Sequence, residues 1–205
     1  MKNLFGLLFV FFSLSLSAND FELVKKKAEI GDSASQLQLG ITYEYAYKNH
    51  QEALYWYLKA AEQGLSGAQF LLGVKYYRGM GVLQNYQEAL HWYQKAATQG
   101  HADAQSHLGL MYSKGEGVLQ SQKEAVKWLR RAAGQGHSKA QYHLGTMYYY
   151  GKGTLRNNNI AYSWFLLANH NGEEVNLSKF KMNTDINKSQ QIAKICLETN
   201  YRICE

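Results

Sequence analysis

The chain has 205 residues, of which 46% are apolar and 19% are charged, and its formal net charge is +6. This balance is typical of a folded protein and excludes a chain that is disordered throughout. The basic residues are mostly scattered, so the charge does not indicate a nucleic-acid partner, and the absence of proline favours an all-helical chain.

The first 18 residues differ in composition from the rest. Lys2 precedes an apolar stretch from Leu4 to Leu16, and small residues follow as far as Ala18. This order is typical of a secretory signal peptide, and the stretch is shorter than the about 20 apolar residues that a membrane-spanning helix needs. We therefore expect a bacterial signal peptide at residues 1–18 and a periplasmic or secreted mature chain with no stable membrane insertion. An uncleaved N-terminal anchor is the alternative.

A period of 36 residues runs through the chain after residue 33. It is kept by Trp56, Trp92, Trp128 and Trp164, and by Gly73, Gly109 and Gly145. Such a fixed period predicts a solenoid, in which each unit covers the apolar face of its neighbour. The predicted units are residues 34–64, 67–100, 103–136 and 139–172. We expect a capping helix in residues 19–33, and a linker with a second capping helix in residues 173–205.

Each unit is expected to form two helices joined by a glycine loop. In the unit 67–100, Ala68, Leu72 and Tyr76 share one face of a helix over about residues 67–78. Gly73 inside this helix predicts that the backbone of another helix approaches closely. Gly79 is placed to end the helix in the left-handed conformation. A second helix is expected over about residues 87–99, with Trp92 filling the space between layers.

The repeated pattern is A-x-x-x-L-G-x-x-Y-x-x-G-x-G-V, followed by A-x-x-W-Y-x-x-A-A-x-Q-G. It resembles the Sel-one-like repeat family, relatives of the tetratricopeptide repeats, over residues 34–172. The resemblance implies an all-α fold, an α/α superhelical solenoid of about four helix-turn-helix repeats, and a role as a protein-binding scaffold or adaptor. Residues 44–50 replace the G-x-G loop in the first unit, so this turn should be shaped differently. The fourth unit drifts from the pattern near residue 169.

Cys196 and Cys204 are the only cysteines. In one continuous helix they would lie about 12 Å apart, which is too far for a disulfide. A bridge therefore requires the chain to turn back at residues 198–201, where Asn200 can take the left-handed conformation. An isolated pair in an exported protein favours a disulfide that holds the end of the chain. Two free thiols are the alternative.

Two patterns could carry chemistry. Residues 178–181 (Ser-Lys-Phe-Lys) match the S-x-x-K nucleophile motif of penicillin-recognising enzymes, but the K-T-G and S-D-N motifs are absent. His107 and His143 occupy equivalent positions, and imidazole is a good zinc ligand, but no carboxylate or cysteine recurs beside them. We therefore expect no enzyme activity, no cofactor and no metal.

The variable side of the first helix of each unit remains as a candidate site. Tyrosine, arginine and methionine gather there, and such residues bury large areas in protein interfaces. We predict that this side binds a protein or peptide, with about half of its positions in the core. The predicted partner-binding residues are Tyr45, Phe70, Val74, Arg78, Leu110, Lys114, Tyr142 and Tyr150. The alternatives are a β-lactamase-associated or penicillin-binding cell-envelope enzyme, and a secreted factor that acts on host cells.

Overall fold

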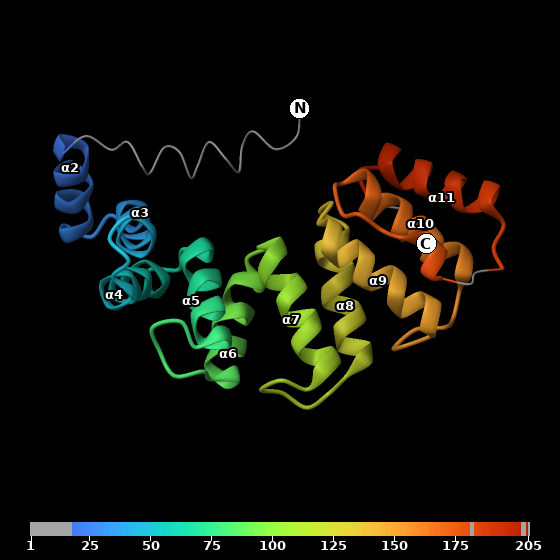
Figure 1. The fold of residues 1–205 in the computed structure, drawn as a ribbon, viewed down its shortest axis with the longest axis horizontal. Helices are drawn as coiled ribbons and strands as arrows, with labels where there is room; N and C mark the ends of the chain where they lie inside the picture. The colour runs from blue at the N-terminus through green and yellow to red at the C-terminus, as the bar shows by residue number, and fades with distance from the viewer. Residues whose placement is uncertain (1–17, 181–182, 202–203, 205) are drawn as a thin grey trace. The chain divides into compact units, whose positions relative to one another are not determined.

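The fold is described from a computed structural model that covers residues 18–180, 183–201 and 204. The expected signal peptide lies outside these residues, apart from Ala18, which begins the first described helix. The described part of the chain is helical and contains no strand, and this confirms the predicted fold class (Figure 1).

The described residues form ten α-helices and one 3-10 helix. They are α2 (Ala18–Glu29), α3 (Ser33–Tyr45), α4 (His50–Glu62), α5 (Ser66–Arg78), α6 (Tyr86–Thr98), α7 (Ala102–Lys114), α8 (Gln122–Ala133), α9 (Ser138–Tyr150), α10 (Asn158–His170), η1 (Leu177–Lys179) and α11 (Ile186–Glu198). In the unit from which the pattern was read, α5 and α6 begin one residue before the expected positions. The repeat period therefore predicted the start of both helices to within one residue.

The chain divides within α6 into two compact units, one ending at Lys95 and one beginning at Ala96. In the first unit, α3 packs against α2 and α4, and α5 packs against α4. In the second unit, α8 packs against α7 and α9, and α10 packs against α9 and α11. Packing between helices that follow one another along the chain is what a repeat protein requires.

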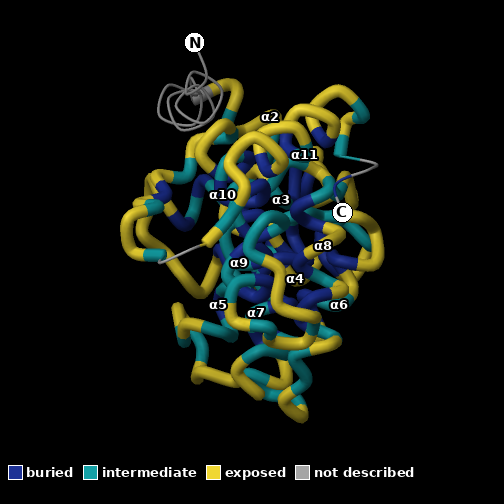
Figure 2. Tube along the Cα trace, turned by 90° about the vertical axis from the view of Figure 1, so that its right-hand side faces the viewer, coloured by how far each residue is buried: buried dark blue, intermediate teal, exposed yellow. Residues whose placement is uncertain are grey.

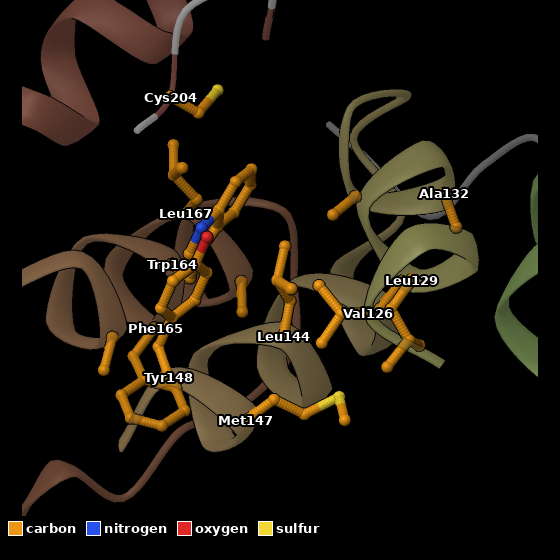
Figure 3. Packing of buried hydrophobic residues seen from close by; sticks show 14 of the residues in the cluster. Val126, Leu129, Ala132, Leu144, Met147, Tyr148, Trp164, Phe165, Leu167 and Cys204 are labelled. Atoms are coloured by element: carbon orange, nitrogen blue, oxygen red, sulfur yellow. The ribbon is translucent and has the colours of Figure 1, made fainter. Parts of the chain in front are cut away.

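Alanine and leucine at recurring positions form the core of each unit. Ala68 and Leu72 of α5 are fully buried in the first unit, and Ala140 and Leu144 of α9 are fully buried in the second. In Figure 2 the buried residues lie mainly along the helices, whereas the connecting loops are mostly intermediate or exposed. In Figure 3, Leu144 lies beside Val126 of α8. Small alanines allow this close packing because they add little width to a helix.

The glycine inside each first helix makes room for one side chain of the following helix. A Cβ at Gly145 would lie 2.8 Å from the Phe165 ring and 3.0 Å from the carbonyl oxygen of Ala161. The equivalent pairs are Gly40 with Tyr57, Gly73 with Tyr93, and Gly109 with Leu129. The sequence predicted the approach of a backbone. The structure shows that a ring or a leucine takes the space first, with a backbone carbonyl close by at Gly40, Gly109 and Gly145.

The four recurring tryptophans do not share one environment. Trp164 is 1% exposed, and Trp56 and Trp92 are also buried. Trp128 is only half-buried, and the guanidinium of Arg131 lies 4.5 Å from the centre of its ring. Trp128 is therefore less enclosed than the other three tryptophans.

A glutamine near the start of each first helix bonds to the repeat before it. Its amide nitrogen donates to the carbonyl oxygen of a buried alanine in four equivalent pairs: Gln36 with Ala28, Gln69 with Ala61, Gln105 with Ala97, and Gln141 with Ala133. Gln135 Nε2 then donates to Gln105 Oε1 at 2.7 Å. The buried amides thereby find partners, as buried polar groups must.

The loops between the two helices of a repeat follow two designs. Gly79, Gly115 and Gly151 end α5, α7 and α9 in the left-handed conformation, which confirms the prediction made for Gly79. The loop after α3 has no glycine, and Lys48 takes a φ of 54° there before Asn49 caps α4. The first turn is therefore shaped differently, as the sequence predicted.

This glycine-free turn is accompanied by a buried ion pair in the first unit. Lys75 Nζ contacts one carboxylate oxygen of Glu44, and His50 Nδ1 lies 3.0 Å from the other. Glu44 and Lys75 are both buried. Met111 and Met147 stand at the repeat positions that correspond to Lys75. Among these three equivalent positions of α5, α7 and α9, only Lys75 carries a charge, and it pairs with an acid of the preceding repeat.

The segment after α10 turns back and covers that helix. Asp185 caps α11, which begins at Ile186 within the range where the second capping helix was expected. Cys196 and Cys204 form a disulfide, with their Cα atoms 4.7 Å apart. Asn200 and Tyr201 have φ values of 50° and 63°, so two left-handed residues bring the chain back toward Cys196.

Candidate functional site

The first unit contains four of the predicted partner-binding residues. Tyr45 is 68% exposed at the end of α3, and Arg78 is exposed at the end of α5. Phe70 and Val74, in the middle of α5, are half-buried, and the Phe70 ring lies 5.9 Å from the buried Tyr93 ring. In this unit, the accessible part of the predicted surface is the C-terminal end of each first helix.

The second unit contains the other four and shows the same division. Leu110 and Tyr142 are half-buried, and the Tyr142 ring lies 5.7 Å from Phe165 in the core. Lys114 is exposed, and Tyr150 is 59% exposed, at the C-terminal ends of α7 and α9. The middle positions thus contribute to packing, and the end positions face solvent.

Aromatic rings and cations lie together at these helix ends. Tyr149 and Tyr150 are 4.8 Å apart between ring centres, and Lys152 Nζ lies 5.5 Å above the Tyr150 ring. Tyr47, which is 57% exposed and 5.6 Å from the Tyr43 ring, extends the surface in the first unit. Tyr47 was not predicted as a site residue because the glycine-free loop lies outside the repeat pattern.

Two histidines cap first helices in the second unit. His101 Nδ1 accepts from Ala104 N, and His137 Nδ1 accepts from Ala140 N. His137 donates from Nε2 to Asp103 at 3.1 Å, and this hydrogen bond lowers the pKa of the Asp103 carboxyl. Sequence reasoning did not find these caps, because histidine is not among the preferred capping residues.

His107 and His143 are not arranged as a metal site. His107 donates from Nδ1 to the carbonyl oxygen of Asp103. Burial lowers the pKa of His143 to about 4, and the nearby positive groups of His137, Lys114, Lys139 and His107 add to this effect. Within the described ranges, no three His, Cys, Asp or Glu side chains are placed to hold a metal ion.

The S-x-x-K pattern lies in η1 and the residues after it. Ser178 is exposed, and its hydroxyl donates to Asn176 Oδ1 at 2.6 Å. Lys181, which would complete the motif, lies outside the described residues. The Ser178 hydroxyl is therefore hydrogen-bonded within its own turn. No observation on the described residues favours the enzyme alternative.

Among the described residues, each unit has a small hollow on its surface. A hollow of about 300 Å³ lies beside Tyr55 and Trp56, and another of about 350 Å³ lies beside Arg156 and Asn158. Neither is lined by a predicted partner-binding residue. In each unit, the exposed predicted residues therefore lie at the helix ends, outside these two hollows.

The fold and these exposed helix ends define an α/α repeat protein. The family model of the Sel1 repeat matches residues 33–65, 66–101, 102–137 and 138–173. The chain therefore belongs to the Sel1 repeat family. Proteins of this family are generally non-catalytic scaffolds that mediate protein–protein interaction.

Solved structures support the same assignment. A Sel1 repeat protein from Oxalobacter formigenes is 30% identical, with a TM-score of 0.73 over 88% of this chain and 75% of its own. A protective antigen of uropathogenic Escherichia coli with an SLR fold is 34% identical, with a TM-score of 0.70 over 90% of this chain. This chain covers only 38% of that antigen.

A curated relative matches over a shorter segment. It is the ERAD-associated E3 ubiquitin-protein ligase component HRD3A of Arabidopsis thaliana, 32% identical over 66 residues. The match covers 30% of this chain and 10% of the relative. The similarity is therefore confined to a small part of a much longer protein.

Proposed function

We propose that this protein is an exported adaptor that binds a protein or peptide at the C-terminal ends of its first helices. The observation that carries the proposal is the exposure of large aromatic and cationic side chains there. Tyr45 and Arg78 are exposed at these ends in the first unit, and Lys114 and Tyr150 are exposed at them in the second, so each unit has a surface of this kind. Tyrosine and arginine bury much area at modest entropic cost, so they suit protein recognition.

Export is the second part of the proposal. The apolar segment before Ala18 supports it, and so does the disulfide between Cys196 and Cys204, because disulfides persist in oxidising compartments. Mass spectrometry of the chain from its own cells tests export directly. A chain that begins near Asn19 is expected, and an intact N-terminus on a cytosolic chain would contradict it.

Binding is tested by affinity capture from the cell envelope, followed by titration of the captured protein once it is purified. The variant replaces Arg78 and Tyr150 by alanine. We expect affinity to fall at least about tenfold, because truncating an interface anchor commonly costs more than 1 kcal/mol. The matched control is Tyr55→Ala on α4, since Tyr55 is 49% exposed but lies on a second helix.

The control variant should bind as the parent does. Equal affinity for the parent and the Arg78/Tyr150 variant would move the site away from the first-helix ends. Circular dichroism of each variant checks that any loss of binding does not come from unfolding. This result is independent of the export test, so the two parts of the proposal can fail separately.

A further inference from the structure

Each G-x-G loop exposes a leucine. Leu83 of the first unit is 90% exposed, and Leu119 and Leu155 of the second unit are each 88% exposed. The loop glycines recur for a structural reason, because they take positive φ values such as 69° at Gly117. The leucines have no such reason, since a side chain left in solvent adds nothing to the core.

In the second unit, two of these loops lie next to each other. A Cβ at Gly153 would overlap the main chain of Gln122 and Lys123, so the loop 151–157 packs against the start of α8. Leu119 precedes α8 by only a few residues. The loops 115–121 and 151–157, together with Lys123, therefore form one surface, which we call the leucine edge.

The leucine edge also carries exposed positive charge. Lys123, Lys152 and Arg156 are exposed there. The acidic residues at the same place are already paired, Glu116 with Lys114 at 3.5 Å and Glu124 with Lys127 at 2.6 Å. The net field of the leucine edge is therefore positive, and an anionic surface is its electrostatic complement.

We propose that the leucine edge attaches to the anionic surface of a lipid bilayer. Leu119 and Leu155 enter the boundary between headgroups and acyl chains, and Lys123, Lys152 and Arg156 contact the headgroups. Peripheral binding of this kind combines buried apolar area with attraction to anionic lipid. It needs no membrane-spanning helix, and none of the described helices is long and apolar enough to be one.

The shape of the leucine edge favours a bilayer over an acidic peptide. A protein partner is anchored by side chains that fill pockets, with a rim that excludes water. Here the two leucines are each 88% exposed on successive loops, and the hollow beside Arg156 and Asn157 is lined by polar residues, with neither leucine among them. A fluid bilayer accepts protruding leucines without a matching pocket. The inference goes beyond the adaptor function and does not depend on which protein the first helices bind.

Vesicle co-sedimentation tests the proposal. The chain from residue 19 onward is mixed with vesicles of phosphatidylcholine alone, and with vesicles that also contain phosphatidylglycerol. Residues 1–18 are omitted because their apolar stretch would itself bind lipid. We expect binding to the phosphatidylglycerol vesicles only, weakened by added salt because salt screens exposed charges. A parent chain that ignores both kinds of vesicle would overturn the proposal.

Variants separate the two contributions. Replacing Leu119 and Leu155 by serine should weaken binding by about tenfold or more for each leucine that enters the bilayer. Lys152→Gln should weaken it about fivefold, at roughly 1 kcal/mol per cation near an anionic surface. The matched controls are Ile30→Ser, which removes an apolar side chain that is 80% exposed in the other unit, and Lys188→Gln on α11.

Both control variants should bind vesicles as the parent does, and thermal unfolding should show that every variant is folded. Leucine variants that bind like the parent would overturn the insertion of Leu119 and Leu155. The proposal would also be overturned if the parent bound a soluble acidic peptide containing leucine but no vesicles, since the leucine edge would then be a protein-docking surface.

Discussion

Asn171 donates from Nδ2 to Oε1 of Gln141 at 2.9 Å, and Gln141 in turn donates to the carbonyl oxygen of Ala133. The earlier repeats contain a glutamine where Asn171 stands, as at Gln135. The shorter amide still reaches its partner, and it also donates to the Tyr201 hydroxyl at 2.7 Å. The fourth repeat therefore keeps the hydrogen bond to the glutamine of its first helix, although its sequence departs from the pattern. Through Tyr201, the same amide also contacts the C-terminal turn.

Gln141→Ala should destabilise the second unit by about 1–3 kcal/mol, because it removes the hydrogen bond to the Ala133 carbonyl and the hydrogen bond from Asn171. Gln141 is fully buried, so water cannot replace the lost bonds. Chemical denaturation measures the effect. The control is Gln190→Ala on the exposed side of α11, which should change stability by less than about 0.5 kcal/mol. Equal effects of the two variants would contradict the role of Gln141.

Gly145→Ala should destabilise the protein by about 1–3 kcal/mol, because the added methyl group would press on the Phe165 ring and the Ala161 carbonyl. Gly67→Ala serves as the control. Its Cβ would lie 3.5 Å from Leu37, and alanine favours a helix by up to about 1 kcal/mol over glycine. Thermal unfolding should show opposite signs for the two changes. A smaller loss when Phe165→Leu accompanies Gly145→Ala would identify the ring as the obstacle.

The repeat pattern was enough to predict the helices and their first loops, because its alanines, leucines and glycines are set by packing between adjacent helices. It could not predict how far each site residue is exposed. The sequence predicted both Tyr142 and Tyr150 as site residues. In the structure, Tyr142 packs against Phe165, whereas Tyr150 is exposed to solvent. The loop leucines Leu83, Leu119 and Leu155 recur with the repeat, and recurrence alone does not distinguish a packed position from an exposed one.

Trp164→Ala should cost about 3–5 kcal/mol of unfolding free energy, as expected for a large buried aromatic residue. Trp164 is 1% exposed. Trp128→Ala should cost clearly less, because its ring is only half-buried. Chemical denaturation of the two variants side by side tests this difference. If Trp128→Ala proved as costly as Trp164→Ala, the tryptophan positions would be structurally equivalent after all.

His143 should make the protein sensitive to acid. Its folded pKa is about 4, below the ordinary value of 6.5, so the unfolded chain binds more protons between these values. The stability that the neutral imidazole contributes is complete above about pH 6.5 and is lost as the pH falls toward 4. For a half-buried group, this loss is on the order of 1–2 kcal/mol.

His143→Gln should therefore flatten the decline of melting temperature between pH 6.5 and pH 4. His170→Gln is the matched control, since His170 is exposed near the end of α10. It should leave the parent profile unchanged. An identical acid profile for the parent and His143→Gln would show that another group is responsible.

The disulfide should stabilise the C-terminal cap. Cys196 and Cys204 are eight residues apart, and closing a loop of this size stabilises a fold by about 2–3 kcal/mol in the chain-entropy model. Replacing both cysteines by alanine should increase hydrogen exchange in α11. Exchange in α3, which belongs to the other compact unit, should be unaffected. Unchanged protection of α11 would mean that packing against α10 is sufficient to hold it.

The ion pair between Glu44 and Lys75 constrains how this array can grow during evolution. If the repeat at residues 102–137 directly followed the first, Met111 would meet Glu44 in place of Lys75. A buried carboxylate that loses its cation costs about 3–5 kcal/mol. We therefore expect a repeat inserted between the first two to be selected against unless it also carries a cation at the position of Lys75.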